Sequence, residues 1–179
     1  RVLAVEPFSG CVRCMEETCR VNQLDWVKVC AGAASDRNST IRLALQSASE
    51  LNEVITDDSQ SLQPGTFEEV PCFTLDSLID QENLSHVDWL KIDAEGHEMQ
   101  VLKGGDRLLR DFKPGILYEN VSGAKSNNQP VAEFLIAQGY NLFCYRPYLQ
   151  ELVPVNTDQT LTNKLNIIAL PQASDLVSS

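Results

Sequence analysis

Short apolar runs that lack a polar face recur along the chain, and they constrain the fold more than any other feature. They lie at residues 2–5, 26–34, 87–92 and 115–119. A strand with one solvated face alternates apolar and polar residues, whereas a strand covered on both faces is apolar throughout. Helix-like segments separate the runs, at residues 9–24 and from residue 97 onward. This alternation predicts an α/β domain with a mainly parallel, doubly wound sheet.

The C-terminal part departs from this alternation. Residues 140–146 and 165–170 are strand-like, and only a polar loop joins them, without a clear helix. They are therefore predicted to pair antiparallel at one edge of a mixed sheet. Polar, turn-rich segments at 46–69 and 122–130 are predicted loops. With 179 residues, 43% of them hydrophobic, the chain is predicted to form a single domain over residues 1–179.

Composition excludes several classes of function. Acidic residues outnumber basic ones 25 to 14, and the formal charge of −11 disfavours a generic nucleic-acid surface. The longest uninterrupted apolar run, residues 167–170, is far shorter than the roughly 20 residues of a membrane-spanning helix.

Six cysteines favour free thiols in a reducing intracellular compartment. Cys11, Cys14 and Cys19 have a spacing that a metal or cluster site could use, but no second C-x2-C pair accompanies them. No metal site is predicted from these residues.

Three of the apolar runs end on an acid: Glu6, Asp93 and Glu119. In parallel sheets ligands bind beyond the carboxyl ends of the strands, so these acids are predicted to share one functional rim. Glu6 is a candidate for accepting hydrogen bonds from the hydroxyls of a nucleoside ribose.

The densest polar cluster follows the third run, in the sequence KIDAEGHE at residues 91–98. Glu98 fits an ordinary helix start, where the helix dipole favours negative charge. His97 is either a general base or an exposed bystander. A divalent metal between Asp93 and Glu95 is conceivable, but two acids do not make a site, and none is predicted.

The same segments resemble the core signature of the FkbM-type methyltransferases. Residues 74–78, 91–98, 101–104 and 116–119 match the family pattern in order and spacing. Residues 2–7 resemble the family's second strand with its ribose-binding acid, and residues 27–36 resemble the segment that borders the adenine. The resemblance implies a Rossmann-like class I methyltransferase fold that binds S-adenosyl-L-methionine. It implies O-methylation of a sugar or small-molecule hydroxyl.

The resemblance also implies roles for individual residues. Glu6, Gly32, Ala33 and Asp93 would bind the cofactor. The acceptor would lie near the candidate catalytic residues Asp93, Glu95, His97 and Glu119.

One family element is absent from the sequence, namely the glycine-rich strand and turn that cradle the methionine part of the cofactor. In the family this strand is central, between the strands that residues 2–5 and 87–92 resemble. Its absence predicts a domain truncated at its N-terminus, with unpaired strand edges. Either upstream residues or another protein subunit completes the sheet, or the domain is a catalytically inactive methyltransferase-like subunit with a structural or interaction role in a larger assembly.

Overall fold

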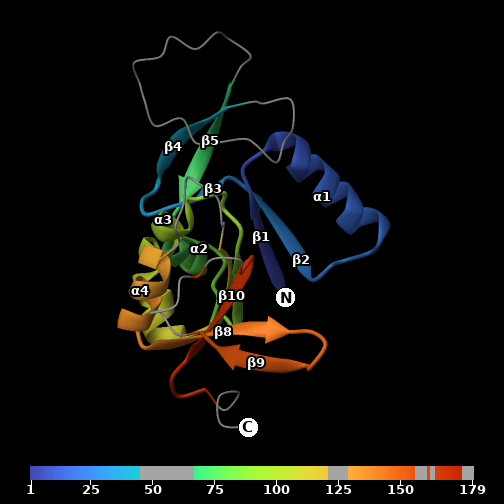
Figure 1. Cartoon of the computed structure of the whole chain (residues 1–179). Coiled ribbons are helices and arrows are strands. Elements are labelled where there is room, and N and C mark those ends of the chain that lie inside the picture. The colour runs from blue at the N-terminus through green and yellow to red at the C-terminus, as the bar shows by residue number, and fades with distance from the viewer. Residues whose placement is uncertain (45–66, 121–128, 156–160, 162–163, 175–179) are drawn as a thin grey trace. The chain divides into compact units, whose positions relative to one another are not determined.

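The computed structural model describes residues 1–44, 67–120, 129–155, 161 and 164–174 (Figure 1). The chain forms two compact units, Arg1–Thr74 and Leu75–Ser179. Mixed sheets and helices make up both units, in agreement with the predicted α/β class.

The first unit begins with a strand, a helix and a parallel strand: β1 (Val2–Glu6), α1 (Ser9–Val21) and β2 (Val27–Ala31). The register runs from Val2 opposite Val27 to Glu6 opposite Ala31. A parallel pair needs a crossover connection, and α1 supplies it. The carboxyl ends of the two strands, at Glu6 and Ala31, therefore lie at the same rim. This agrees with the parallel arrangement predicted for the pair.

A second sheet completes this unit. It consists of β3 (Ala33–Ala34), β5 (Phe67–Phe73) and β4 (Ser39–Ala44) in that order, and it buries Ala33, Val70 and Cys72 together. The sequence predicted a loop through residue 69, but β5 already begins at Phe67. Glu68 and Glu69 belong to it because they pair with Leu43 and Arg42 of β4. The rest of the loop predicted at 46–69 lies outside the described residues.

The second unit contains a five-stranded sheet with the order β6-β7-β10-β8-β9. The strands are β6 (Trp89–Ile92), β7 (Gly115–Glu119), β10 (Asn166–Pro171), β8 (Tyr140–Arg146) and β9 (Glu151–Pro154). The first two are parallel, and β10 is antiparallel to both of its neighbours. Ile116, Tyr118, Ile167 and Ala169 are fully buried, so β7 and β10 form the centre of the core.

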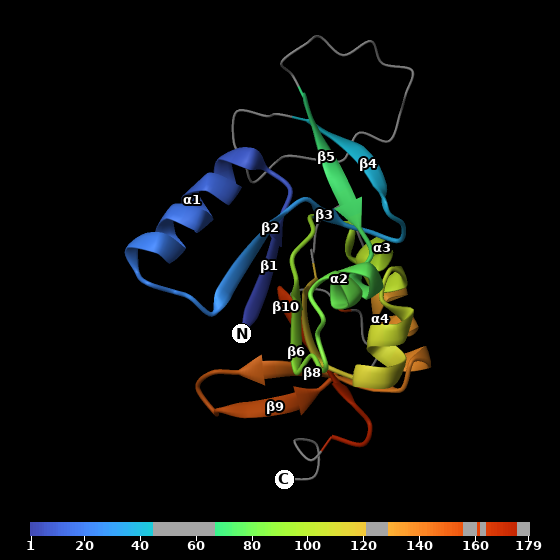
Figure 2. The same cartoon turned by 180° about the vertical axis from the view of Figure 1, so that it is seen from behind.

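Helices α2 (Leu75–Gln81), α3 (Glu98–Lys103) and α4 (Gln129–Ala137) gather on one side of this sheet (Figure 2). Leu102 and Leu135 are fully buried. A π-helical turn, η2 (Leu108–Phe112), precedes β7. Helix α3 ends at Lys103, and Gly104 follows as its C-cap. None of the helices in the described ranges is long and apolar enough to cross a membrane.

Two expectations about the sheet are wrong. The strand predicted over 165–170 does pair antiparallel with residues 140–146, but it lies inside the sheet and not at its edge. The edge strand on this side of the sheet is β9, which falls in the segment predicted as a polar loop. Full burial of Ile167 and Ala169 explains the internal position of β10, because a central strand buries more apolar surface than an edge strand.

The parallel strands also do not form one sheet. Among the described residues β1 pairs only with β2, and β6 ends the five-stranded sheet and pairs only with β7. Each strand therefore has one edge without a strand partner among the described residues, and the missing central strand stays a prediction.

Candidate functional site

Glu6 lies at the carboxyl end of β1, where the chain turns into α1. Its side-chain Oε1 accepts a hydrogen bond of 2.8 Å from the backbone N–H of Phe8, and its backbone oxygen accepts one of 3.0 Å from Gly32 N. The first bond orients the carboxylate, and the second joins Glu6 to the segment that follows β2. Sequence reasoning placed Glu6 and Gly32 in one cofactor site, and the structure brings their backbones together.

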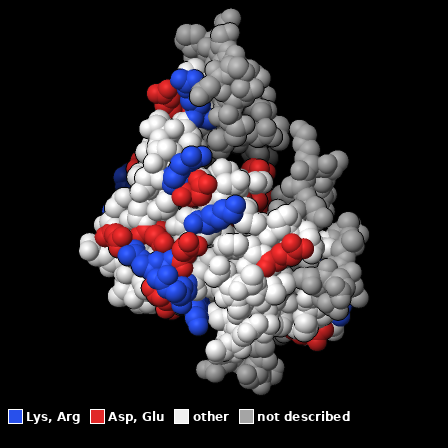
Figure 3. Space-filling model, turned by 90° about the vertical axis from the view of Figure 1, so that its left-hand side faces the viewer, with Lys and Arg blue, Asp and Glu red and all other residues white. Residues whose placement is uncertain are grey.

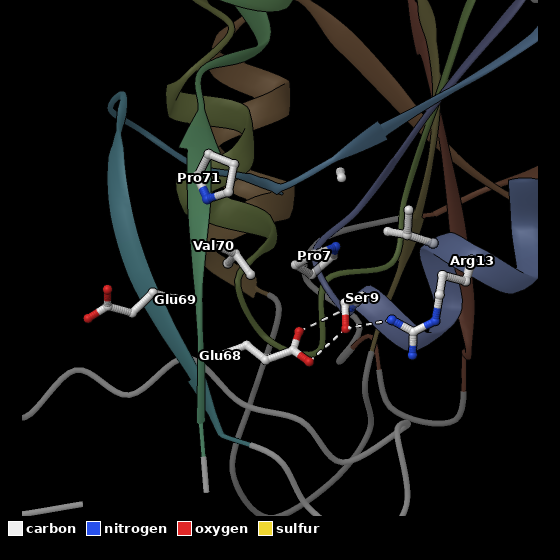
Figure 4. Close-up of a pocket in the computed structure, with 9 residues that line it drawn as sticks. Pro7, Ser9, Arg13, Glu68, Glu69, Val70 and Pro71 are labelled. Atoms are coloured by element: carbon white, nitrogen blue, oxygen red, sulfur yellow. Dashed lines mark hydrogen bonds between the residues drawn. The ribbon is translucent and has the colours of Figure 1, made fainter. Parts of the chain in front are cut away.

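A pocket of about 420 Å³ opens beside this rim (Figure 4). Its lining comes from the residue after β1, the first turns of α1, the end of β2 and the strand β5: Pro7, Ser9, Val12, Arg13, Ala31, Glu68, Glu69, Val70 and Pro71.

Glu68 crosses the pocket to the start of α1. Its two carboxylate oxygens accept from Ser9 N at 3.1 Å and from Ser9 Oγ at 2.7 Å. A carboxylate on free N–H groups at a helix start is favoured by the helix dipole. Glu68 thus fixes the start of α1 against β5, and the pocket keeps its shape.

Gly32 is buried, and it has no room for a side chain. A Cβ there would lie 2.6 Å from the Phe73 ring and 2.7 Å from the backbone oxygen of Pro71. Ala33 is buried next to it and pairs with Cys72 of β5. The backbone at this rim is therefore held close to β5, and only a residue without a side chain fits at position 32.

In the second unit, Asp93 follows β6 and Glu119 ends β7. The register pairs Ile92 with Tyr118, so the two acids occupy the next positions on adjacent parallel strands. Carboxylate oxygens of Asp93, Glu95 and Glu119 all lie within 4.8 Å of one another. The predicted meeting of Asp93 with Glu119 is confirmed, and Glu95 joins them. Glu6 belongs to the other unit, so its predicted place at a shared rim stays a prediction.

The two strand-end acids have opposite protonation tendencies. A hydrogen bond from Lys91 Nζ at 2.6 Å holds the pKa of Asp93 below its usual range. Burial raises the pKa of Glu119, and its hydrogen bond to Asp93 raises it further. As the pH falls, Glu119 therefore takes up a proton before Asp93 does.

A tight turn places Glu95 beside this pair. Glu95 and Gly96 both have left-handed backbone angles, with φ of 48° and 93°. The fully buried Glu98 stabilises the turn, because its Oε1 accepts from Ala94 N at 3.1 Å and Gly96 N at 3.2 Å. Sequence reasoning explained Glu98 by the helix dipole alone, and it missed this bond to the turn.

His97 is half-buried and precedes α3. Its backbone N–H donates to Ala94 O at 2.9 Å, and its backbone oxygen accepts from Gln100 and Val101, both at 3.1 Å. These bonds give its backbone a structural part in the turn. A catalytic part for its side chain stays a prediction.

All six cysteines are free thiols in the structure. Burial raises the pKa of Cys72 and of Cys144, which makes both poor nucleophiles at neutral pH.

Glu68, Ser9 and Arg13 of the pocket were not singled out from the sequence. Glu68 was assigned to a loop, and its hydrogen bonds reach a residue 59 positions away. The alternation of residues on β5 is the one local signal that could have indicated a strand there.

Comparison with known proteins now adds to this geometry. Residues 1–142 match the family model of the FkbM methyltransferase domain. The chain also resembles the crystal structure of the methyltransferase FkbM from Methylobacillus flagellatus KT, with a TM-score of 0.59 and 14% identity. That match covers 94% of this chain and 36% of the other, so the chain spans about a third of the length of its solved neighbour. No curated protein matches the chain.

Proposed function

Since the chain belongs to the FkbM methyltransferase family, we propose that it binds S-adenosyl-L-methionine and takes part in O-methylation of a sugar or small-molecule hydroxyl. The observation that carries the proposal is the rim of β1 and β2, where Glu6, Gly32 and a pocket come together.

The residues of this rim fit the adenosine half of the cofactor. Phe8 N–H engages one oxygen of the Glu6 carboxylate, and the carboxylate has further acceptor positions for ribose hydroxyls. Gly32 lets the backbone run close to β5, beside the pocket, and Ala33 continues that surface. An adenine ring would lie against apolar lining such as Val12 and Val70.

When bound, the cofactor supplies the methyl group for an in-line displacement by the acceptor oxygen. The chain's own contribution is to orient that oxygen and to receive its proton. We assign this to Asp93 and Glu119, with Glu95 and His97 beside them. Ionised Asp93 accepts a hydrogen bond from the hydroxyl. Glu119 has the higher pKa, so it is the stronger proton acceptor once ionised.

The charge distribution favours a small acceptor over a nucleic acid. Figure 3 shows basic side chains interspersed with acidic ones on one face of the molecule, and no large basic patch gathers among the described residues on that face. Several of the arginines are paired, as in Arg107 with Asp80 and Arg110 with Asp111. Phosphate binding would need clustered, unpaired cations.

A titration followed by NMR tests cofactor binding. Residues 1–179 do not include the glycine-rich turn, and each backbone hydrogen bond that it would donate to the cofactor contributes roughly 0.5–1.5 kcal/mol. We therefore expect weak binding to these residues. NMR can detect weak binding. S-adenosyl-L-methionine should shift the amide resonances of Phe8, Ser9, Gly32 and Ala33. Replacing Glu6→Ala should weaken these shifts, because the ribose loses its carboxylate.

Glu17→Ala is the matched control. Glu17 is an exposed acid on α1 that pairs with Arg20, so its removal should leave the shifts unchanged. Equal effects of the two substitutions, or no shifts at millimolar cofactor, would overturn the assignment of this rim.

A further inference from the structure

The carboxylates of Asp93, Glu95 and Glu119 converge at the carboxyl ends of β6 and β7, and the geometry points to a binding site for one divalent metal ion there. Sequence alone offered two neighbouring acids in one turn, which do not make a site. The structure adds Glu119 at the end of β7, so the turn after β6 contributes two oxygens and β7 contributes a third.

The span of the cluster fits a single cation. Oxygens on opposite sides of Mg²⁺ lie about 4.2 Å apart, and those around Ca²⁺ about 4.8 Å apart, since the metal–oxygen distances are about 2.1 and 2.4 Å. One oxygen from each acid lies within 4.8 Å of the others. Small adjustments of exposed side chains are therefore enough to surround an ion.

Glu98 provides an independent observation. This residue is fully buried, and its Oε2 has no hydrogen-bond partner among the described residues. Its Oε1 accepts from Ala94 N and Gly96 N of the turn that carries Glu95, so Glu98 lies beside the cluster. A buried carboxylate oxygen without a partner costs free energy, and a cation at the adjacent cluster would offset that cost.

Local charge favours a dication over the cation already present. The ammonium group of Lys91 donates to Asp93 and brings one positive charge to the three acids of the cluster. A divalent ion would bring two further positive charges to these three acids. All ligands are carboxylate oxygens, a set that suits Mg²⁺, Mn²⁺ or Ca²⁺ better than zinc. Asp93 and Glu95 are exposed, so the ion would keep several waters.

Binding of Mn²⁺ to the 179-residue chain tests this inference. Electron paramagnetic resonance measures the free ion during a titration at neutral pH. One ion should bind per chain, and Mg²⁺ or Ca²⁺ should displace it. Glu95→Gln and Glu119→Gln should each weaken binding about tenfold or more, because each removes one charged ligand. Circular dichroism checks that each variant is folded, and Glu95 lies on an exposed turn where substitution leaves the core intact.

Glu133→Gln is the matched control, an exposed acid on α4 of the same unit. It should bind Mn²⁺ like the unaltered chain. Absence of saturable binding into the millimolar range, where even the weakest protein calcium sites bind, would overturn the inference. So would binding that neither ligand substitution weakens. The titration contains no methyl donor, and failure of the proposed methyl transfer would leave its result intact.

Discussion

In the part of the chain that the structure describes, the hydroxyl groups of Tyr118 and Tyr140 are buried without a hydrogen-bond partner. Burial raises the pKa of both phenols, that of Tyr140 to about 12. A buried donor without an acceptor costs about 1–3 kcal/mol. Each of these hydroxyl groups therefore lowers the free energy of unfolding, while the ring that carries it fills space in the core.

Replacing Tyr140→Phe is therefore expected to raise the free energy of unfolding by about 1 kcal/mol at pH 7, since it removes an unsatisfied hydroxyl and keeps the ring. The gain should grow with pH. Between about pH 10 and pH 12 the unfolded chain releases the phenol proton while the folded chain retains it, so the stability of the unaltered protein falls. At pH 11 the difference should exceed the neutral value by about 1.4 kcal/mol. Urea denaturation at both pH values measures it.

Tyr148→Phe serves as the control, because Tyr148 is fully exposed. It should change stability little at either pH. A Tyr140→Phe variant that is less stable at pH 7, or whose gain does not increase toward pH 11, would contradict this account.

At this scale the strand-end acids were predictable and their partners were not. Glu6, Asp93 and Glu119 each follow an apolar run, which is a local signal. The bonds of Glu68 to Ser9 and the approach of Glu119 to Glu95 depend on which strands become neighbours. Sequence spacing does not contain that information.

Asp76 lies in the first turn of α2, and its side chain joins this helix to the π-helical turn η2. Its two carboxylate oxygens accept from the backbone N–H groups of Arg107 and Leu108, each at 3.0 Å. These groups begin the π-helical turn η2 and would otherwise lack acceptors. One side chain thus joins two helical elements that are about 30 residues apart in the chain.

Asp76→Ala should lower the free energy of unfolding by about 2 kcal/mol, because two charge-assisted hydrogen bonds are lost at once. Asp80→Ala provides the comparison. It removes only an exposed ion pair with Arg107, and such pairs contribute about 1 kcal/mol or less. Thermal and urea denaturation of both variants decide the point, and similar losses would show that Asp76 acts merely as a surface charge.

Element existence was largely predictable, because apolar runs and helical periodicity are local. The parallel pairs β1–β2 and β6–β7 and the helix α1 are confirmed. Strand β9 was missed, since its four residues include Glu151 and Pro154 and lack an apolar run. The Pro at its end suits an edge strand, which needs no partner on one side.

For the whole molecule, the position of β10 is the feature that the sequence did not reveal. The strand lies between β7 and β8, and it follows both of them in the chain. It also lies beyond residues 1–142, which match the family model. Local periodicity indicates that a strand exists, but the order of strands depends on which arrangement buries most apolar surface.

Ala169→Asp is expected to destabilise the second unit by about 3 kcal/mol or more. Ala169 is fully buried at the centre of the sheet, so an aspartate there would be an unpaired charge without solvent. Asn166→Asp, on an exposed position of the same strand, should have little effect. The fluorescence of Trp89, whose ring packs over Gly115, reports on this sheet. Equal stability of the two variants would place β10 outside the core.

The internal position of β10 also bears on the synthesis of the protein. The ribosome synthesises β6, β7 and β8 before Asn166–Pro171. At that stage β10, the strand that lies between β7 and β8 in the native sheet, has not yet been made. The facing edges of β7 and β8 then expose unpaired backbone N–H and C=O groups until the final strand is made, and such edges are prone to aggregate. The second unit can reach its native sheet only after residue 171 has left the exit tunnel.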